Sequence, residues 1–166
     1  ILLARIDPID VAPSAILYQP VVSTRNERIT IGARSRVDAF VKLEGGRGLS
    51  IGEHVHIASF CHVNIGGGQT ILEDGASMGS GAKTISGGNA PDAISASRVV
   101  DDDAQVLTHA TIIIGKNACL YANAIAYCKE GVLTIGEGSR IGAGSLLLQS
   151  VPPGEVWAGV PARFIR

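Results

Sequence analysis

Aromatic residues are scarce in this sequence, at 4% of 166 residues, although hydrophobic residues reach 46%. A core without rings has to be filled by Ile, Val, Leu and Ala, which favours thin and repetitive packing. Charge of one sign is also lacking, because 14 Lys and Arg face 15 Asp and Glu and leave a net charge of −1. With no basic run either, the sequence lacks the electrostatic footprint of a nucleic-acid-binding protein.

Long apolar runs are missing as well. Stretches such as 111–114 and 146–148 are far shorter than the roughly 20 residues that a membrane-spanning helix needs, and no signal-peptide pattern opens the chain. The three cysteines, Cys61, Cys119 and Cys128, are odd in number and show no metal-ligand spacing, which is typical of a reducing compartment. We therefore expect a cytoplasmic protein without a membrane span.

Glycine is abundant, with 21 residues that follow no Gly-X-Y period, so the glycines are expected at recurrent tight corners. The tetrad aliphatic-x-Ile-Gly occurs four times, and a weaker relative of it contains Leu72. Successive intervals between these positions are 20, 21, 42 and 21 residues, so one repeat is expanded. The aligned positions are Ile31, Ile51, Leu72, Ile114 and Ile135.

A six-residue period runs within each repeat, with an aliphatic residue at the first position and a small or β-branched residue at the fifth. Three hexads make 18 residues, so the remaining two or three residues belong at one corner, where Gly45-Gly46 and 66–68 occur. Short strands separated by such corners wrap into a three-sided prism whose coils stack about 4.8 Å apart. An antiparallel sandwich is the alternative, and the strict period argues against it.

The sequence therefore predicts an all-β fold, a parallel β-helix of hexapeptide repeats with about five coils. We expect one domain over residues 1–166, with an irregular N-terminal cap at 1–28 and a C-terminal cap or tail at 151–166. One excursion loop is expected at about 86–105, before the pattern resumes near Val106. Long loops on a rigid solenoid usually bind a ligand or contact a neighbouring subunit.

Two segments resemble the hexapeptide-repeat acyltransferase superfamily, especially sugar O- and N-acetyltransferases. The C-terminal run 159–166 is similar to the family's Gly-x-Pro-Ala-Arg/Lys tail, and 56–64 followed by 66–68 is similar to polysaccharide-modifying O-acetyltransferases. The resemblance implies a left-handed helix, a homotrimer, and a coenzyme A thioester such as acetyl-CoA bound between subunits as acyl donor. It also implies a small acceptor, a sugar or nucleotide sugar.

Acyl transfer to a hydroxyl or amine needs a general base, and histidine suits that task at neutral pH. His109 lies where the chain re-enters the prism, near the place where enzymes similar to serine acetyltransferase carry their base. His62, which should stack on Lys83, and His56 are further candidates. Asn89 stands where galactoside-type enzymes carry their catalytic histidine, so either one of these three histidines takes that role or activity is weak or absent.

The same resemblance suggests binding residues. Asn64 is similar to the substrate-binding asparagine of galactoside and maltose acetyltransferases, and a small-residue run near the C-terminus would let the pantetheine arm approach the backbone. An arginine of the tail could meet a phosphate. The predicted acceptor-binding residues are Asn64, Lys83, Asn89 and Asp92, and the predicted cofactor-binding residues are Gly142, Ala143, Gly144, Ser145, Arg163 and Arg166.

Two other functions stay open at the level of sequence. The His54-x-His56 pair invites a comparison with γ-class carbonic anhydrases, which bind zinc on a similar fold, but the His-x4-His pair of that family is absent and we predict no metal site. A catalytically silent trimer that serves as a binding protein or scaffold is the other alternative. Affinity for coenzyme A distinguishes the transferase from the scaffold.

Overall fold

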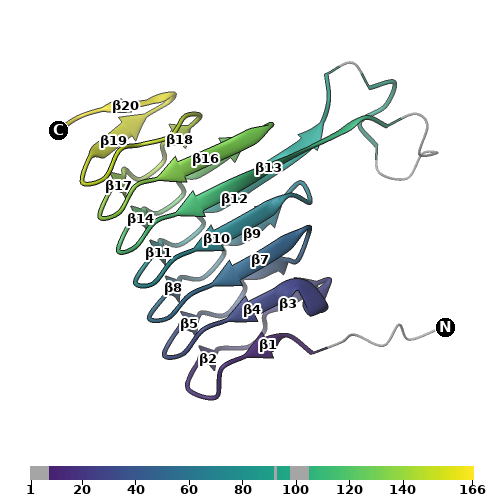
Figure 1. Ribbon diagram of the computed structural model, residues 1–166, viewed down its shortest axis with the longest axis vertical. Coiled ribbons are helices and arrows are strands. Elements are labelled where there is room, and N and C mark those ends of the chain that lie inside the picture. Colours follow the sequence, from purple (N-terminus) through teal and green to yellow (C-terminus); the bar gives the residue numbers. More distant parts are fainter. Residues whose placement is uncertain (1–7, 92, 98–104) are drawn as a thin grey trace.

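The computed structural model describes residues 8–91, 93–97 and 105–166, and it folds as a parallel β-solenoid (Figure 1). Strands β1 to β18 form six turns of three short strands each. The first three turns comprise β1 (Asp10–Val11), β2 (Ile16–Leu17), β3 (Val22–Thr24), the 3-10 helix η1 (Asn26–Arg28), β4 (Ile29–Ile31), β5 (Arg36–Val37), β6 (Lys42–Glu44), β7 (Gly48–Ile51), β8 (His56–Ile57) and β9 (His62–Ile65).

The next three turns and the C-terminal hairpin complete the fold. They comprise β10 (Gln69–Leu72), β11 (Ser77–Met78), β12 (Lys83–Asn89), β13 (Leu107–Ile114), β14 (Cys119–Leu120), β15 (Ile125–Cys128), β16 (Gly131–Ile135), β17 (Arg140–Ile141), β18 (Leu146–Leu147), β19 (Val156–Gly159) and β20 (Ala162–Phe164). β19 continues the face of β17 in parallel, and β20 folds back on it antiparallel. The described part of the chain has no helix long and apolar enough to cross a membrane.

The strand register confirms the intervals read from the sequence. Ile31 pairs with Ile51, Ile51 with Leu72, Leu72 with Ile114 and Ile114 with Ile135, all in parallel. Stacking the aliphatic residues of successive coils removes them from water, so the apolar pattern fixes the register of each turn.

The first and fifth positions of the hexads line the interior of the prism. The aliphatic first positions are at most 3% exposed, and the fifth positions carry small side chains that fit the corners of the triangle. These positions, from the second turn to the sixth, are Ile31, Ser35, Val37, Val41, Ile51, Val55, Ile57, Cys61, Leu72, Ala76, Met78, Ala82, Ile114, Ala118, Leu120, Ala124, Ile135, Ser139, Ile141 and Ser145.

The solenoid has six turns and not about five, because most of the segment predicted as an irregular N-terminal cap forms a first coil. Val11 pairs with Ile31, and the same hexad spacing continues at Ala15, Leu17 and Val21, which pack against the core. This coil lacks an Ile-Gly tetrad, so its repeat was not recognised in the sequence.

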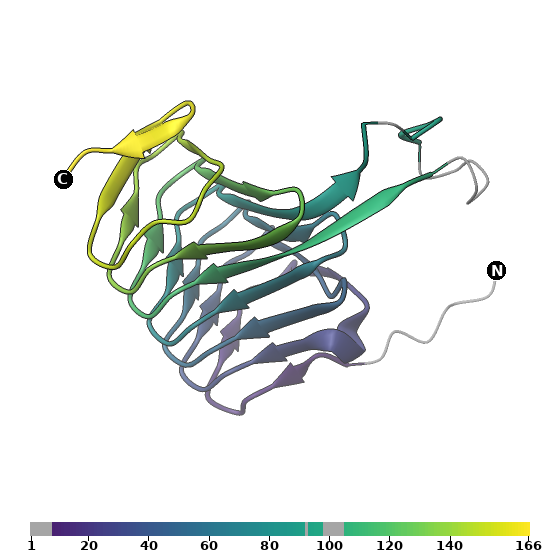
Figure 2. The same ribbon diagram turned by 45° about the horizontal axis from the view of Figure 1, so that its top comes forward.

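The segment predicted as an excursion loop at 86–105 begins as a β-hairpin. β12 extends to Asn89 and pairs antiparallel with the start of β13. Gly87 lies opposite His109, and Asn89 lies opposite Leu107. Figures 1 and 2 show this pair of strands projecting from the side of the prism. The hairpin places residues at the end of β12 and the start of β13 next to the corners of the first three turns.

Candidate active site

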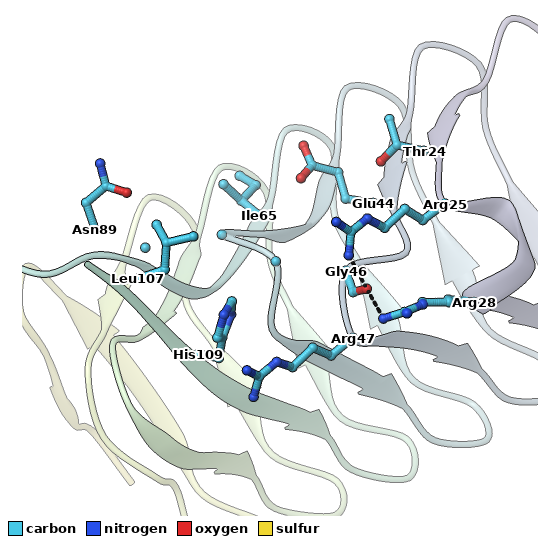
Figure 3. Close-up of a pocket in the computed structure, with 13 residues that line it drawn as sticks. Thr24, Arg25, Arg28, Glu44, Gly46, Arg47, Ile65, Asn89, Leu107 and His109 are labelled. Carbon is cyan, nitrogen blue, oxygen red and sulfur yellow. Dashed lines mark hydrogen bonds between the residues drawn. The ribbon is translucent and has the colours of Figure 1, made fainter. Parts of the chain in front are cut away.

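A groove of about 610 Å³ lies between the base of the hairpin and the corners of the first three turns (Figure 3). Its size is typical of small-molecule sites. Charged side chains come from the N-terminal turns, glycine backbone forms part of the wall, and the hairpin supplies an imidazole. The lining residues are Thr24, Arg25, Arg28, Glu44, Gly46, Arg47, Ile65, Gly66, Gly67, Gly88, Asn89, Leu107 and His109.

His109 is half-buried at the base of β13, on the hairpin side of the groove. Its ring lies over Gly67, where a β-carbon would sit 3.8 Å from Cε1. Gly66 and Gly67 both have left-handed backbones, with φ of +93° and +78°, and a β-carbon on Gly66 would clash with the Gly87 carbonyl at 2.5 Å. Glycine is therefore required for the close packing of this corner against the hairpin.

Three arginines supply the positive charge of the groove. Arg25 and Arg28 each donate a hydrogen bond from Nη1 to the Gly46 carbonyl, at 3.3 and 3.0 Å, and this shared acceptor brings the two guanidinium groups together. Figure 3 shows the third, Arg47, extending from the same corner toward His109. All three residues are exposed.

Glu44 is the one carboxylate among the lining residues, and it is already paired. Its Oε1 accepts hydrogen bonds from His62 Nε2 at 2.6 Å and from Lys42 Nζ at 2.9 Å. Burial raises the pKa of the Glu44 carboxyl, but the hydrogen bonds from Lys42 and His62 outweigh burial and hold the pKa below its ordinary value. Glu44 is thus an ionised partner that orients His62.

His62 and Lys83 stack in register, as predicted, but neither lines the groove. His62 reaches the site through its hydrogen bond to Glu44, which lines the groove. Lys83 directs Nζ to the Gly81 carbonyl, 3.0 Å away. The structure therefore brings His62 to the rim of the site and leaves Lys83 outside it.

Asn64 was predicted to bind the acceptor, and the structure shows a different role. Its side chain is fully buried, with Oδ1 accepting from Ser86 Oγ at 2.7 Å and Thr70 Oγ1 at 3.0 Å. Nδ2 donates to the carbonyls of Glu44 at 2.8 Å and Gly68 at 3.1 Å. Because these hydrogen bonds are made inside the protein, Asn64 stabilises the backbone of the corner at 66–68, which lines the groove, and its side chain does not face a ligand.

His56 lies on another face of the prism, since β8 belongs to the sheet of β5 and β11. Its Nε2 is 3.1 Å from Asp38 Oδ2, and Arg36 Nε binds the other carboxylate oxygen. Burial raises the pKa of Asp38, but the hydrogen bonds from Arg36 and His56 outweigh it, so this pKa is lowered. His56 is thus part of a surface ion-pair cluster, away from His109.

The comparison with carbonic anhydrases is not supported by the side-chain arrangement. His56, on β8, and His62, on β9, lie in different sheets, so these two histidines do not stack side by side. Over the described ranges, no group of three or more His, Cys, Asp or Glu side chains could hold a metal ion.

The remaining acceptor candidates divide. Asn89, at the end of β12, lines the groove. Asp92 lies outside the described residues.

The predicted cofactor residues lie at the C-terminal end of the solenoid, away from the groove of this chain. Ser145 is 2% exposed and its Oγ accepts a hydrogen bond from the Gly159 amide at 3.0 Å, so its hydroxyl closes the cap and is not presented to a ligand. Gly142 is covered by Ala158 of β19. Ala143 and Gly144 remain exposed at the corner, and Arg163 and Arg166 are exposed on the tail.

Sequence reasoning missed the three arginines. Arg25 and Arg28 fell within the supposed irregular cap, and Arg47 lies in a corner insertion outside the hexad template. A signal in the sequence could have revealed them. Val11, Ala15, Leu17 and Val21 follow the hexad spacing and therefore form a coil below the first recognised one. In that coil residues 25–28 fall at the same corner as Arg47 does in the next coil.

The described site sits on a hexapeptide-repeat β-solenoid, and known proteins of this class are similar to the chain. No protein-family model matches it. Serine acetyltransferase of Salmonella typhimurium is 35% identical over 78 residues, which cover 40% of this chain and 28% of that enzyme. UDP-3-O-acylglucosamine N-acyltransferase of Caulobacter sp. is 31% identical over 114 residues, which cover 60% of this chain and 33% of that enzyme. The chain thus spans about a third or less of these relatives.

A solved structure matches over a greater length. A variant of AntD, an N-acyltransferase from Bacillus cereus in complex with dTDP-4-amino-4,6-dideoxyglucose and coenzyme A, gives a TM-score of 0.85 at 22% identity. The match covers 96% of this chain and 83% of AntD. The chain has the fold of the hexapeptide-repeat acyltransferase superfamily and shares local sequence with several of its enzymes.

Proposed function

We propose that the protein is an acyltransferase that moves an acetyl or other acyl group from a coenzyme A thioester to a hydroxyl or amine of a sugar-like acceptor. The observation that carries the proposal is the placement of His109 at the hairpin side of a ligand-sized groove. Similarity to enzymes named as acyltransferases supports it, and in the AntD crystal structure both coenzyme A and a nucleotide amino sugar are bound.

His109 is proposed as the general base. Its imidazole accepts the proton of the acceptor hydroxyl or amine as that oxygen or nitrogen bonds to the thioester carbonyl carbon. The carbon–sulfur bond then breaks, and the proton passes to the departing thiolate, which leaves as the coenzyme A thiol. Asn89 and the half-buried Gly67 line the same groove, where they would contact the acceptor.

We further propose a homotrimer, as the family resemblance implies. The outer face of the sheet formed by β12, β15 and β18 supports it, because apolar residues project outward there. Ile85, Ile125, Tyr127 and Leu146 are partly exposed, and Leu148 is 50% exposed. Contiguous exposed apolar side chains of this kind mark a surface that associates. A second subunit on this face would bring new groups beside the hairpin.

Isothermal titration of the full chain with acetyl-CoA tests the transferase proposal. We expect saturable binding at micromolar concentration, with free coenzyme A binding the same site. Absence of binding to a folded protein would overturn the proposal and favour the silent scaffold. Supplying dTDP-4-amino-4,6-dideoxyglucose and simple sugars as acceptors then identifies the group that is acylated.

A further inference from the structure

The groove contains three arginines, and the acidic side chain that lines it does not neutralise their positive charge. Glu44 accepts hydrogen bonds from Lys42 and His62, so its negative charge is already compensated by groups other than the three arginines. The contact between Arg28 and Glu27 is long, at 3.7 Å, and about half exposed on both sides, so it contributes little. No residue in the described part of the chain forms an ion pair with Arg47.

The fold nevertheless holds two of these like charges close together and directs the third into the same groove. Arg25 and Arg28 meet at the carbonyl oxygen of Gly46, and the side chain of Arg47 extends from the same corner toward His109 (Figure 3). Each guanidinium has five N–H donors, and the Gly46 carbonyl engages only one of those of Arg25 and one of those of Arg28. Adjacent cations repel each other, so an arrangement of this kind is relieved by an anion bound between them.

We propose that Arg25, Arg28 and Arg47 bind the diphosphate of a nucleotide, which places the remainder of that molecule beside His109. A diphosphate has enough charge and acceptor oxygens to engage several guanidinium groups, which suit phosphate geometry. The inference rests on the proposed function, since both proposed substrates can supply this chemistry: coenzyme A contains a diphosphate, and so does a nucleotide sugar.

Arg47→Ala is the variant that tests the site most cleanly. Arg47 is exposed and forms no ion pair among the described residues, so its loss removes charge without disturbing the corner. Arg25→Ala and Arg28→Ala also remove a bond to Gly46, and Arg28→Lys keeps charge while losing the planar fork. Arg34→Ala is the matched control, because Arg34 is an exposed arginine paired with Glu53 and does not line the groove.

Calorimetric titration with inorganic pyrophosphate, dTDP and coenzyme A separates the sources of the diphosphate. Pyrophosphate should bind the wild-type chain and bind about 10-fold or more weakly to Arg47→Ala, with Arg34→Ala unchanged. If dTDP affinity falls in parallel and coenzyme A affinity does not, the diphosphate belongs to the acceptor. If coenzyme A affinity falls instead, it belongs to the donor.

Absence of pyrophosphate binding, or equal affinity in wild type and Arg47→Ala, would overturn the inference. In that case acetyl-CoA binding by the wild-type chain would leave the transferase proposal standing. Pyrophosphate binding that depends on Arg47 in a chain that does not bind acetyl-CoA would keep the arginine site and refute the transferase.

Discussion

Asn64 illustrates, at the scale of single residues, how a buried polar side chain can shape a site without touching a ligand. The register between β9 and β12 shifts after His62, so that Ile65 pairs with Ile85. This irregularity has a left-handed backbone at Asn64, with φ of +69°, and turns its side chain into the interior. The acceptor-binding prediction for Asn64 rested on the family resemblance, and the burial of its side chain argues against that role.

Replacing Asn64 with Ala should lower the free energy of unfolding by about 2 to 4 kcal/mol, because two hydroxyls and several carbonyls lose a buried partner. Asn117→Ala is the control, since Asn117 also has a left-handed backbone, with φ of +55°, but is exposed. Chemical denaturation of both variants measures the difference. Equal losses would mean that the left-handed backbone, and not the buried hydrogen bonds, determines the cost.

Glu44 predicts a dependence of stability on pH. Because its pKa is lowered in the folded state, its ionised form stabilises the fold above the ordinary value of 4.5, and the contribution is lost as pH falls through the lower folded pKa. Wild type should therefore melt at a higher temperature than Glu44→Gln at neutral pH, and the difference should vanish in acid.

Thermal unfolding of the two proteins across this pH range measures the effect. Glu53→Gln serves as control, because the ion pair of Glu53 with Arg34 is about half exposed on both sides and contributes little. A difference between wild type and Glu44→Gln that persists unchanged below the folded pKa would contradict the role assigned to Glu44.

Cys61 should be chemically inert in the folded protein. Burial raises the pKa of its thiol to about 11, although nearby backbone hydrogen bonds oppose this, and its side chain is 1% exposed. At neutral pH only about one thiol in 10⁴ would be ionised, and the thiolate is the reactive form. Alkylation followed by mass spectrometry should modify the half-buried Cys119 first, and rapid native labelling of Cys61 would contradict the structure.

At the scale of elements, the turns and their register could be predicted from the sequence because inward aliphatic residues stack directly. The intervals of 20, 21, 42 and 21 residues correspond to observed pairs of strands. The antiparallel pairing of Gly87 with His109 could not be predicted in the same way, because it joins two segments on either side of an insertion that contains no repeat. His109 could nonetheless be proposed from the sequence, because it lies where the chain re-enters the prism before the recognised position Ile114.

The hairpin should depend on Gly87, whose φ is +112° and where a β-carbon would lie 2.3 Å from the Thr108 carbonyl. Gly87→Ala should separate β12 from β13, displace His109 and weaken ligand binding. Gly131→Ala is the matched control, because Gly131 also has a left-handed backbone, with φ of +81°, but a β-carbon there would have no atom within 4 Å. Acetyl-CoA titration and hydrogen exchange of 107–109 report the change, and equal behaviour of the two variants would contradict the assigned role of the hairpin.

At the scale of the whole molecule, the proposed trimer predicts that the apolar outer face of β12, β15 and β18 is covered in solution. Leu148→Glu places a charge on that face and should convert the trimer to monomers, while the exposed Val22 offers a control at the N-terminal turn of the same sheet. Sedimentation or light scattering measures the mass of the wild type, Leu148→Glu and Val22→Glu. A wild type that is monomeric at all concentrations would refute the trimer.

The groove lies where the N-terminal turns meet the hairpin. The stacking of the coils therefore decides which side chains of the turns face His109. The fold could be predicted because it follows from the repeat, whereas Arg25, Arg28 and Arg47 lie in corners whose positions depend on the full stack of coils. The predicted cofactor residues lie at the C-terminal end instead, so a donor that contacts Arg163 or Arg166 would have to reach the groove from there or from a neighbouring subunit.

The most direct test of the account is acceptor-dependent release of the coenzyme A thiol from acetyl-CoA by wild type and His109→Ala, with His54→Ala, an exposed corner histidine, as control. We predict that wild type and His54→Ala turn over equally, and that His109→Ala loses about 10²- to 10⁴-fold in kcat while it still binds acetyl-CoA. Turnover by His109→Ala at the wild-type rate would contradict the assignment of the base, and no turnover by wild type with any acyl acceptor would contradict the transferase itself.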